Sequence, residues 1–152
     1  MTLGMVRVLL IEDDEDDVFL IKDMLAEVSP KVQVTLTCTG RLETGLNLLA
    51  REEIDAILLD LNLPDSRGLD TLKRLSPRES KIPIVVLTGL DDEQTAIEAV
   101  HLGAQDYLIK GEISGQVLAR VLRYAIERKQ VEKNYGTAKN NFGKWSNIST
   151  MP

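Results

Sequence analysis

Residues 56–60 of this chain are Ala-Ile-Leu-Leu-Asp, so that a carboxylate directly follows four apolar residues. A continuous apolar run of this length is typical of a strand buried on both faces of a parallel sheet. Open α/β sheets bind their ligands at the carboxyl ends of such strands. Asp60 is therefore the first candidate for a functional residue, and residues 61–64, Leu-Asn-Leu-Pro, begin the loop beside it.

Three other apolar runs also end in a polar side chain. Residues 8–11 are followed by Glu12 and Asp13, residues 84–87 by Thr88, and residues 107–109 by Lys110. Carboxylates gathered at one sheet edge repel one another, and a hard divalent cation such as Mg²⁺ removes that cost. This edge of the sheet could then bind a phosphoryl group. One of the acids would be the nucleophile, and the lysine ammonium would pair with the negative charge of the phosphoryl group.

Apolar runs alternate with amphipathic stretches five times along the chain. This βα alternation predicts a parallel sheet covered by helices on both faces. The second run alternates apolar and polar residues, which favours a position at the sheet edge. The expected strands are 7–11, 32–38, 54–60, 83–88 and 106–110.

The length of 152 residues suggests one domain with a tail. We assign residues 1–128 to the domain. Residues 129–152 are assigned to an extension of the last helix by one to two turns and a loose tail, because the apolar periodicity fades after Lys129. The stripe 118, 121 and 125 does not continue in apolar residues, so a stable coiled coil is not expected.

Charge and composition narrow the classes of partner. The net charge of −6 divides into +5 from Arg120 onward and −11 before it, which argues against nucleic-acid binding by the main domain. No apolar run reaches membrane-spanning length, and no signal peptide is evident. A single cysteine, Cys38, fits a reducing compartment, so we expect a cytoplasmic protein.

Taken together, these strand ends resemble the receiver domain of two-component response regulators over about residues 5–128. The order and spacing of the motif residues carry the resemblance. They are Glu12-Asp13, Asp60, Pro64, Gly68, Thr88-Gly89, Gly103-Ala104, Tyr107 and Lys110. The resemblance implies a flavodoxin-like five-stranded sheet in the order 2-1-3-4-5, an order that receiver domains share with flavodoxin.

The resemblance also implies a role for each residue. Asp60 would be the phosphoacceptor, and Lys110 would pair with the phosphoryl group. Asp13 and Asp60 would ligate Mg²⁺ directly, Glu12 would do so through a water, and the backbone carbonyl of Asn62 would complete the set. Thr88 and Tyr107 would be the switch residues.

The implied partners are a histidine kinase or histidine phosphotransfer protein and a downstream protein target that the sequence does not name. The signal would leave through helix four, strand five and helix five. A signalling domain with slow self-dephosphorylation is expected rather than an enzyme. A weak homodimer is left open, as is the choice between a stand-alone regulator and a piece of a longer protein.

Several simpler interpretations remain. The acids 14–17 are expected to be a solvated charge block. Tyr107 could be core packing, and His101, the only histidine, is expected to be a surface or capping residue rather than a phosphoryl carrier. The family usually has Lys-Pro with a cis bond after strand five, where this chain has Lys110-Gly111, so the conformation of that loop is open.

Two other functions are weighed against the phosphoacceptor. A haloacid-dehalogenase-type phosphatase also uses an aspartyl phosphate, but it needs a second acid two residues after the nucleophile, where this chain has Asn62. A pseudo-receiver that only binds partners is the main alternative, although competent residues occupy all the key positions.

Overall fold

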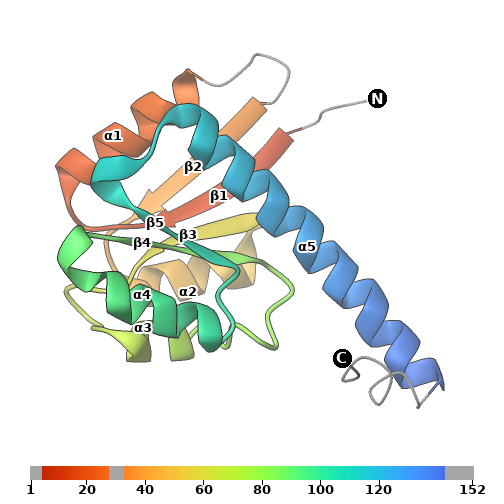
Figure 1. Cartoon of the computed structure of the whole chain (residues 1–152). Helices are drawn as coiled ribbons and strands as arrows, with labels where there is room; N and C mark the ends of the chain where they lie inside the picture. Colours follow the sequence, from red (N-terminus) through yellow and green to blue (C-terminus); the bar gives the residue numbers. More distant parts are fainter. Residues whose placement is uncertain (1–4, 28–32, 143–152) are drawn as a thin grey trace.

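The computed structural model describes residues 5–27 and 33–142, and it has the expected α/β architecture. A single five-stranded parallel sheet has the order β2-β1-β3-β4-β5. Helices cover both of its faces (Figure 1). The strands are β1 (Met5–Ile11), β2 (Gln33–Thr39), β3 (Ala56–Asp60), β4 (Ile84–Thr88) and β5 (Asp106–Ile109). The predicted sheet order is confirmed.

The helices divide into two layers. One layer contains α1 and α5, and the other contains α2, α3 and α4 (Figure 1). Short 3-10 turns, η1 and η2, follow β4 and β5. The bounds are α1 (Glu15–Ala26), α2 (Leu42–Arg51), α3 (Leu69–Lys73), η1 (Leu90–Asp92), α4 (Glu93–His101), η2 (Lys110–Glu112) and α5 (Gly115–Phe142).

Strict alternation along the central strands builds the two cores. Leu9 and Ile57 pack against the α2–α4 layer, whereas Leu10 and Leu58 pack against α1 and α5. Every residue of β3 and β4 is buried, but β2 is half-buried at the sheet edge, as its alternating pattern predicted. Because β3 and β4 are buried along their whole length, their polar terminal residues, Asp60 and Thr88, lie at the carboxyl edge of a well-packed sheet.

The last helix differs from the prediction. It continues to Phe142, well beyond the one to two turns expected after Arg128, so the prediction of a loose tail is wrong for residues 134–142. One glycine at 136 costs about 1 kcal/mol relative to alanine, which the neighbouring helix formers offset. The remainder of the expected tail, 143–152, lies outside the described residues.

The extension also contacts the domain body beyond the expected boundary at residue 128. Lys129 is buried, and its ammonium donates a hydrogen bond to the carbonyl of Pro77 at 3.2 Å. The Glu132 carboxylate accepts one from the amide of Gln105 at 2.8 Å. The first turn after Arg128 is therefore packed against the body.

No described helix, within residues 5–27 and 33–142, is both long and apolar enough to span a bilayer.

Candidate functional site

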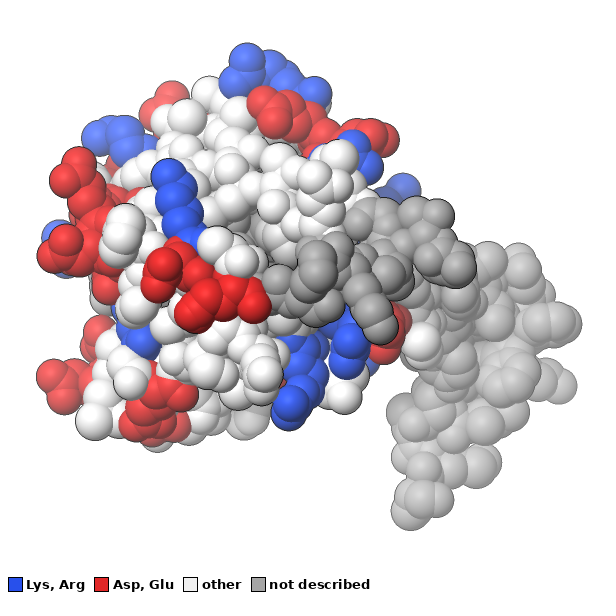
Figure 2. Space-filling view, turned by 90° about the horizontal axis from the view of Figure 1, so that it is seen from above, with Lys and Arg blue, Asp and Glu red and all other residues white. Residues whose placement is uncertain are grey.

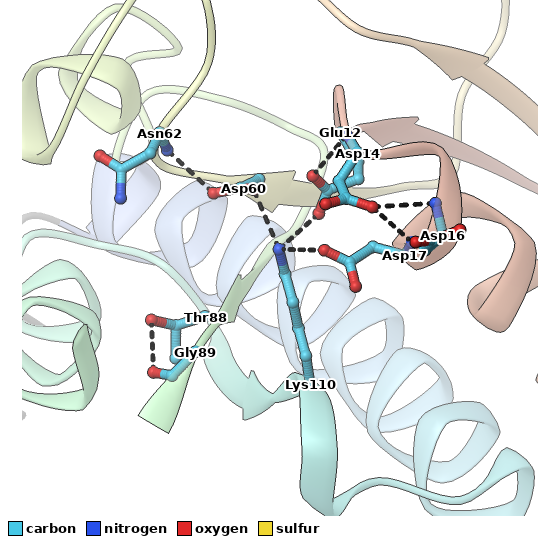
Figure 3. A network of polar contacts seen from close by, with 9 residues as sticks. All are labelled: Glu12, Asp14, Asp16, Asp17, Asp60, Asn62, Thr88, Gly89 and Lys110. Atoms are coloured by element: carbon cyan, nitrogen blue, oxygen red, sulfur yellow. Dashed lines mark hydrogen bonds and ion pairs between the residues drawn. The ribbon is translucent and has the colours of Figure 1, made fainter. Parts of the chain in front are cut away.

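The carboxyl ends of β1, β3 and β5 bring three of the predicted site residues together (Figure 3). The Lys110 ammonium donates a hydrogen bond to Oδ2 of Asp60 at 3.0 Å. It also lies 2.7 Å from Oε1 of Glu12, an ion pair outside hydrogen-bond geometry. The Lys110–Gly111 peptide bond is trans, and the ammonium still reaches Asp60. The glycine therefore does not prevent this contact.

A third carboxylate at the ammonium was not foreseen from the sequence. Oδ2 of Asp17, in the first turn of α1, accepts a hydrogen bond from Nζ of Lys110 at 2.8 Å. The interpretation of Asp17 as part of a solvated block is therefore wrong. Its neighbour Asp14 is the N-cap of α1 and accepts hydrogen bonds from the backbone N–H groups of Asp16 and Asp17.

Glu12, Asp13 and Asp60 form a group that fits a divalent cation. Each offers a carboxylate oxygen, and these oxygens lie within 4.8 Å of one another. Glu12 and Asp60 are buried, whereas Asp13 is exposed, so the group has one open side. Hard oxygen donors with an open side suit Mg²⁺, which keeps several waters and contacts phosphate oxygens.

The pKa values of Glu12 and Lys110 reflect burial and the carboxylates that lie close together. Burial and, after it, the neighbouring Asp60 raise the pKa of Glu12 from 4.5 to about 7, while Lys110 opposes the rise. Burial lowers the pKa of the Lys110 ammonium, but the contacts with the Asp17, Glu12 and Asp60 carboxylates outweigh burial and raise that pKa above its usual range. The ammonium is therefore firmly charged and held among an excess of carboxylates.

These side chains line a cavity of about 530 Å³ at the carboxyl edge. Its walls carry seven carboxylates and one ammonium, those of Glu12, Asp13, Asp14, Glu15, Asp16, Asp17, Asp60 and Lys110. Figure 2 shows acidic side chains gathered on the left, the side on which α1 begins in Figure 1. The acidic walls favour a cation and, with it, a phosphoryl group.

The two expected switch residues lie apart from this cluster. The hydroxyl of Thr88, at the end of β4, donates to the carbonyl of Gly89 at 3.1 Å (Figure 3). The hydroxyl of Tyr107 donates to the Glu93 carboxylate in α4 at 2.8 Å. Tyr107 is half-buried against the core on the α4 side of the sheet. Neither hydroxyl is hydrogen-bonded to Asp60.

The loop after Asp60 is held by two side-chain acceptors. Oδ1 of Asp60 accepts from the backbone N–H of Asn62 at 2.9 Å, whereas the Asn62 side chain accepts from the N–H of Gly68. Asp65 accepts from the backbone N–H groups of Leu42 and Glu43, which lowers the pKa of its carboxyl. Asp65 therefore caps α2 from a distant loop, a role that local sequence patterns did not indicate.

Comparison with known proteins agrees with this geometry. The family model described as "Response regulator receiver domain" matches residues 8–122, which is most of the chain. The chain belongs to this family of two-component signalling domains. The identification made from the strand-end residues is thereby confirmed.

Individual proteins that resemble this chain are also regulators. Over 123 residues the chain is 37% identical to the cell cycle transcriptional regulator CtrA of Caulobacter vibrioides, covering 81% of this chain and 51% of CtrA. It is 28% identical to the regulatory protein AtoC of Escherichia coli K12, covering 93% of this chain and 31% of AtoC. The chain thus spans about half or less of the length of these curated relatives.

A solved structure shares the fold. The signal receiver domain of an HD domain-containing protein from Pseudomonas fluorescens Pf-5 superposes with a TM-score of 0.71 at 25% identity, covering 85% of this chain and 92% of that one.

Proposed function

We propose that this receiver domain is a phosphoacceptor in which Asp60 takes a phosphoryl group from a phosphohistidine on a histidine kinase or phosphotransfer protein. The contact between the Lys110 ammonium and Asp60, at 3.0 Å, carries the proposal. An ammonium at the acceptor oxygen is placed to pair with the incoming phosphoryl oxygens. A cytoplasmic location belongs to the same proposal.

The chemistry is an in-line displacement at phosphorus. An Asp60 oxygen forms the new O–P bond while the P–N bond of the donor breaks and the imidazole nitrogen keeps the electron pair. Asp13 and Asp60 would ligate Mg²⁺, with Glu12 acting through a water and the Asn62 carbonyl completing the set. The ion would neutralise charge on the phosphoryl oxygens.

The acyl phosphate would later be hydrolysed by water, which returns Asp60 and releases inorganic phosphate. Asn62, two residues after Asp60, carries an amide that cannot accept a proton as a general base. Slow self-dephosphorylation is therefore expected, as in a signalling domain rather than a phosphatase.

The output would pass through Thr88 and Tyr107. In the present arrangement the Thr88 hydroxyl is bonded to Gly89 and the Tyr107 hydroxyl to Glu93. A phosphoryl group on Asp60 would attract the Thr88 hydroxyl and open space for the Tyr107 ring. This two-state change would alter the face formed by α4, β5 and α5, on which a downstream protein would bind.

Phosphorylation by a small-molecule donor tests the proposal. Incubation with acetyl phosphate and Mg²⁺ should add one phosphoryl group, visible by intact mass. Asp60→Asn should abolish the adduct, whereas the control Asp70→Asn, in an exposed position on α3, should keep it. An undiminished adduct on Asp60→Asn would refute the acceptor, and no adduct on the wild type would favour the pseudo-receiver.

A further inference from the structure

One contact at the site is not used by the proposed phosphoryl transfer, namely that between Lys110 and Asp17. We propose that Asp17 is a positioning residue that holds the Lys110 ammonium in the unphosphorylated protein and must release it when the phosphoryl group arrives, so that it restrains phosphorylation. The proposal rests on the proposed function, because it concerns the same ammonium.

Three carboxylates surround the ammonium (Figure 3). Its Nζ lies 2.7 Å from Glu12, 2.8 Å from Asp17 and 3.0 Å from Asp60. The contacts with Asp17 and Asp60 are hydrogen bonds, and that with Glu12 is an ion pair. An ammonium has three donors and no more. Two of these donors are already used, and a third carboxylate lies 2.7 Å from Nζ, so a phosphoryl oxygen gains room beside Lys110 when one of the carboxylates gives up its place.

The exposed fractions of the three carboxylate side chains indicate which of them can leave the ammonium most easily. The side chain of Glu12 is 0% exposed and that of Asp60 is 13% exposed, whereas that of Asp17 is 27% exposed. A carboxylate that loses its cation in a buried place bears the desolvation cost without compensation, but one at the surface recovers water. Asp60 must also stay, since it is the acceptor. Asp17 is thus the partner that can leave at the lowest cost.

Asp17 is also held in place by its helix. Its backbone N–H donates to the Asp14 side chain at 3.1 Å, which fixes the first turn of α1 beside the end of β5. The carboxylate therefore returns to the same position whenever the phosphoryl group is absent. Its negative charge would also repel the phosphoryl oxygens, so both effects oppose phosphorylation.

The decisive comparison is between Asp17→Asn and Asp16→Asn. Both remove one negative charge from the same cavity wall, but no hydrogen bond or ion pair joins the described Asp16 side chain to Lys110. With acetyl phosphate as donor, the acyl P–O bond breaks, acetate leaves and the Asp60 O–P bond forms. Asp17→Asn should raise the rate of this step by about two- to fivefold, and Asp16→Asn should change it little.

Beryllofluoride binding gives a second measure, because it does not depend on bond cleavage. Asp17→Asn should bind it more tightly by a similar factor, and Asp17→Glu should restore wild-type behaviour. In the resting protein, the Nζ signal of Lys110 in nitrogen NMR should shift in Asp17→Asn and stay in Asp16→Asn. Asp17→Ser serves as a second variant in case the amide of Asp17→Asn disturbs the fold. It should also raise the phosphorylation rate and tighten beryllofluoride binding.

The outcomes separate this inference from the proposed function. A wild type that takes no phosphoryl group refutes the proposed function. A wild type that is phosphorylated, with Asp17→Asn slower, unchanged or equal to Asp16→Asn, refutes the role of Asp17 alone.

Discussion

Two poorly exposed lysines lie at opposite ends of the sheet and have different surroundings. Lys110, at the carboxyl edge, keeps 19% of its side chain exposed and contacts three carboxylates from α1, β3 and the end of β1. Lys129, near the amino ends of the strands, keeps 7% and contacts one carbonyl, that of Pro77, and one carboxylate, that of Glu132. Both ammonium groups have partners, but only one of them lies among excess negative charge.

This difference agrees with the role proposed for Lys110 in phosphoryl transfer and with a structural role for Lys129. Around Lys129 the single ammonium and the single carboxylate balance, so the group contributes packing and a hydrogen bond and needs no further ligand. Around Lys110 three carboxylates meet one ammonium, and like charges at such distances are costly. A divalent cation would relieve this imbalance at the carboxyl edge, which supports the proposed metal site there.

The largest expected effect is on the rate of phosphorylation, which should depend on Lys110 and not on Lys129. Lys110→Met should slow phosphorylation of Asp60 by acetyl phosphate by about a hundredfold, because a charged donor to the transferring group is lost. Lys129→Met should leave the rate unchanged, since its ammonium is far from the reacting atoms. The rates would be followed by intact mass. Equal phosphorylation rates for the wild type and Lys110→Met would show that Lys110 has no role in phosphoryl transfer.

A second prediction concerns pH and metal at the carboxyl edge. The pKa of Glu12 is raised from 4.5 to about 7, first by burial and then by Asp60. A raised carboxyl pKa contributes stability that is fully present below about pH 4.5 and is lost as the pH rises through about 7. Without metal, the free energy of unfolding should thus fall by about 1–3 kcal/mol between these values.

Urea unfolding in EDTA and in Mg²⁺ would measure this dependence. Mg²⁺ should stabilise the protein more at about pH 8 than at about pH 5.5, because it binds the ionised carboxylates. Glu12→Gln should flatten the fall seen in EDTA, whereas Lys129→Met should leave it in place. An equal gain from Mg²⁺ at both pH values would argue against Glu12 as the group that titrates.

The third prediction tests the structural lysine. Lys129→Met should lower the free energy of unfolding by about 1–2 kcal/mol, because the carbonyl of Pro77 loses its charged donor. Truncation after Arg128 should cost at least as much, since it also removes Glu132 and its bond to Gln105. Thermal unfolding would measure both. A truncated protein as stable as the full chain would show that the contacts of this turn contribute nothing.

These contrasts also show what the sequence could predict. Asp60, Glu12 and Lys110 each end an apolar strand, and parallel strands bring such ends to one edge, so their meeting follows from local pattern and topology. Asp17 lies in a run of acids that looks uniformly solvated. Its contact depends on how α1 meets the end of β5, 93 residues away. Local periodicity carries no information about that docking.

Two other features escaped prediction for the same reason. Asp65 caps α2 across 23 residues of sequence, and no local capping pattern announces it. The burial of Lys129 depends on the loop at Pro77, whereas its residue type favours the surface. The meeting of Asp60, Glu12 and Lys110 was thus predictable from topology, while the contacts made by helix turns and loops, and the position of the Thr88 hydroxyl, needed the packed structure.

The smallest expected effect concerns Tyr107 in β5, which lies between the sheet ends at which Lys110 and Lys129 are found. The hydrogen bond to Glu93 raises the pKa of the Tyr107 phenol, and burial and the charge of Glu93 add to it. Glu93→Ala should therefore lower that pKa toward the ordinary tyrosine value, as measured by NMR of the ring carbon that bears the hydroxyl. Glu98→Ala, also on α4, removes a charge without touching this bond and should leave the pKa in place.

The same pair of variants tests whether Tyr107 transmits the state of Asp60. The bond to Glu93 holds the phenol in its present position, so its loss should allow the ring to leave more readily. Beryllofluoride should then perturb the amide signals of α4 and β5 at lower concentration in Glu93→Ala than in Glu98→Ala. Shifts confined to the loops around Asp13 and Asp60 in every variant would mean that the signal leaves the carboxyl edge by another route.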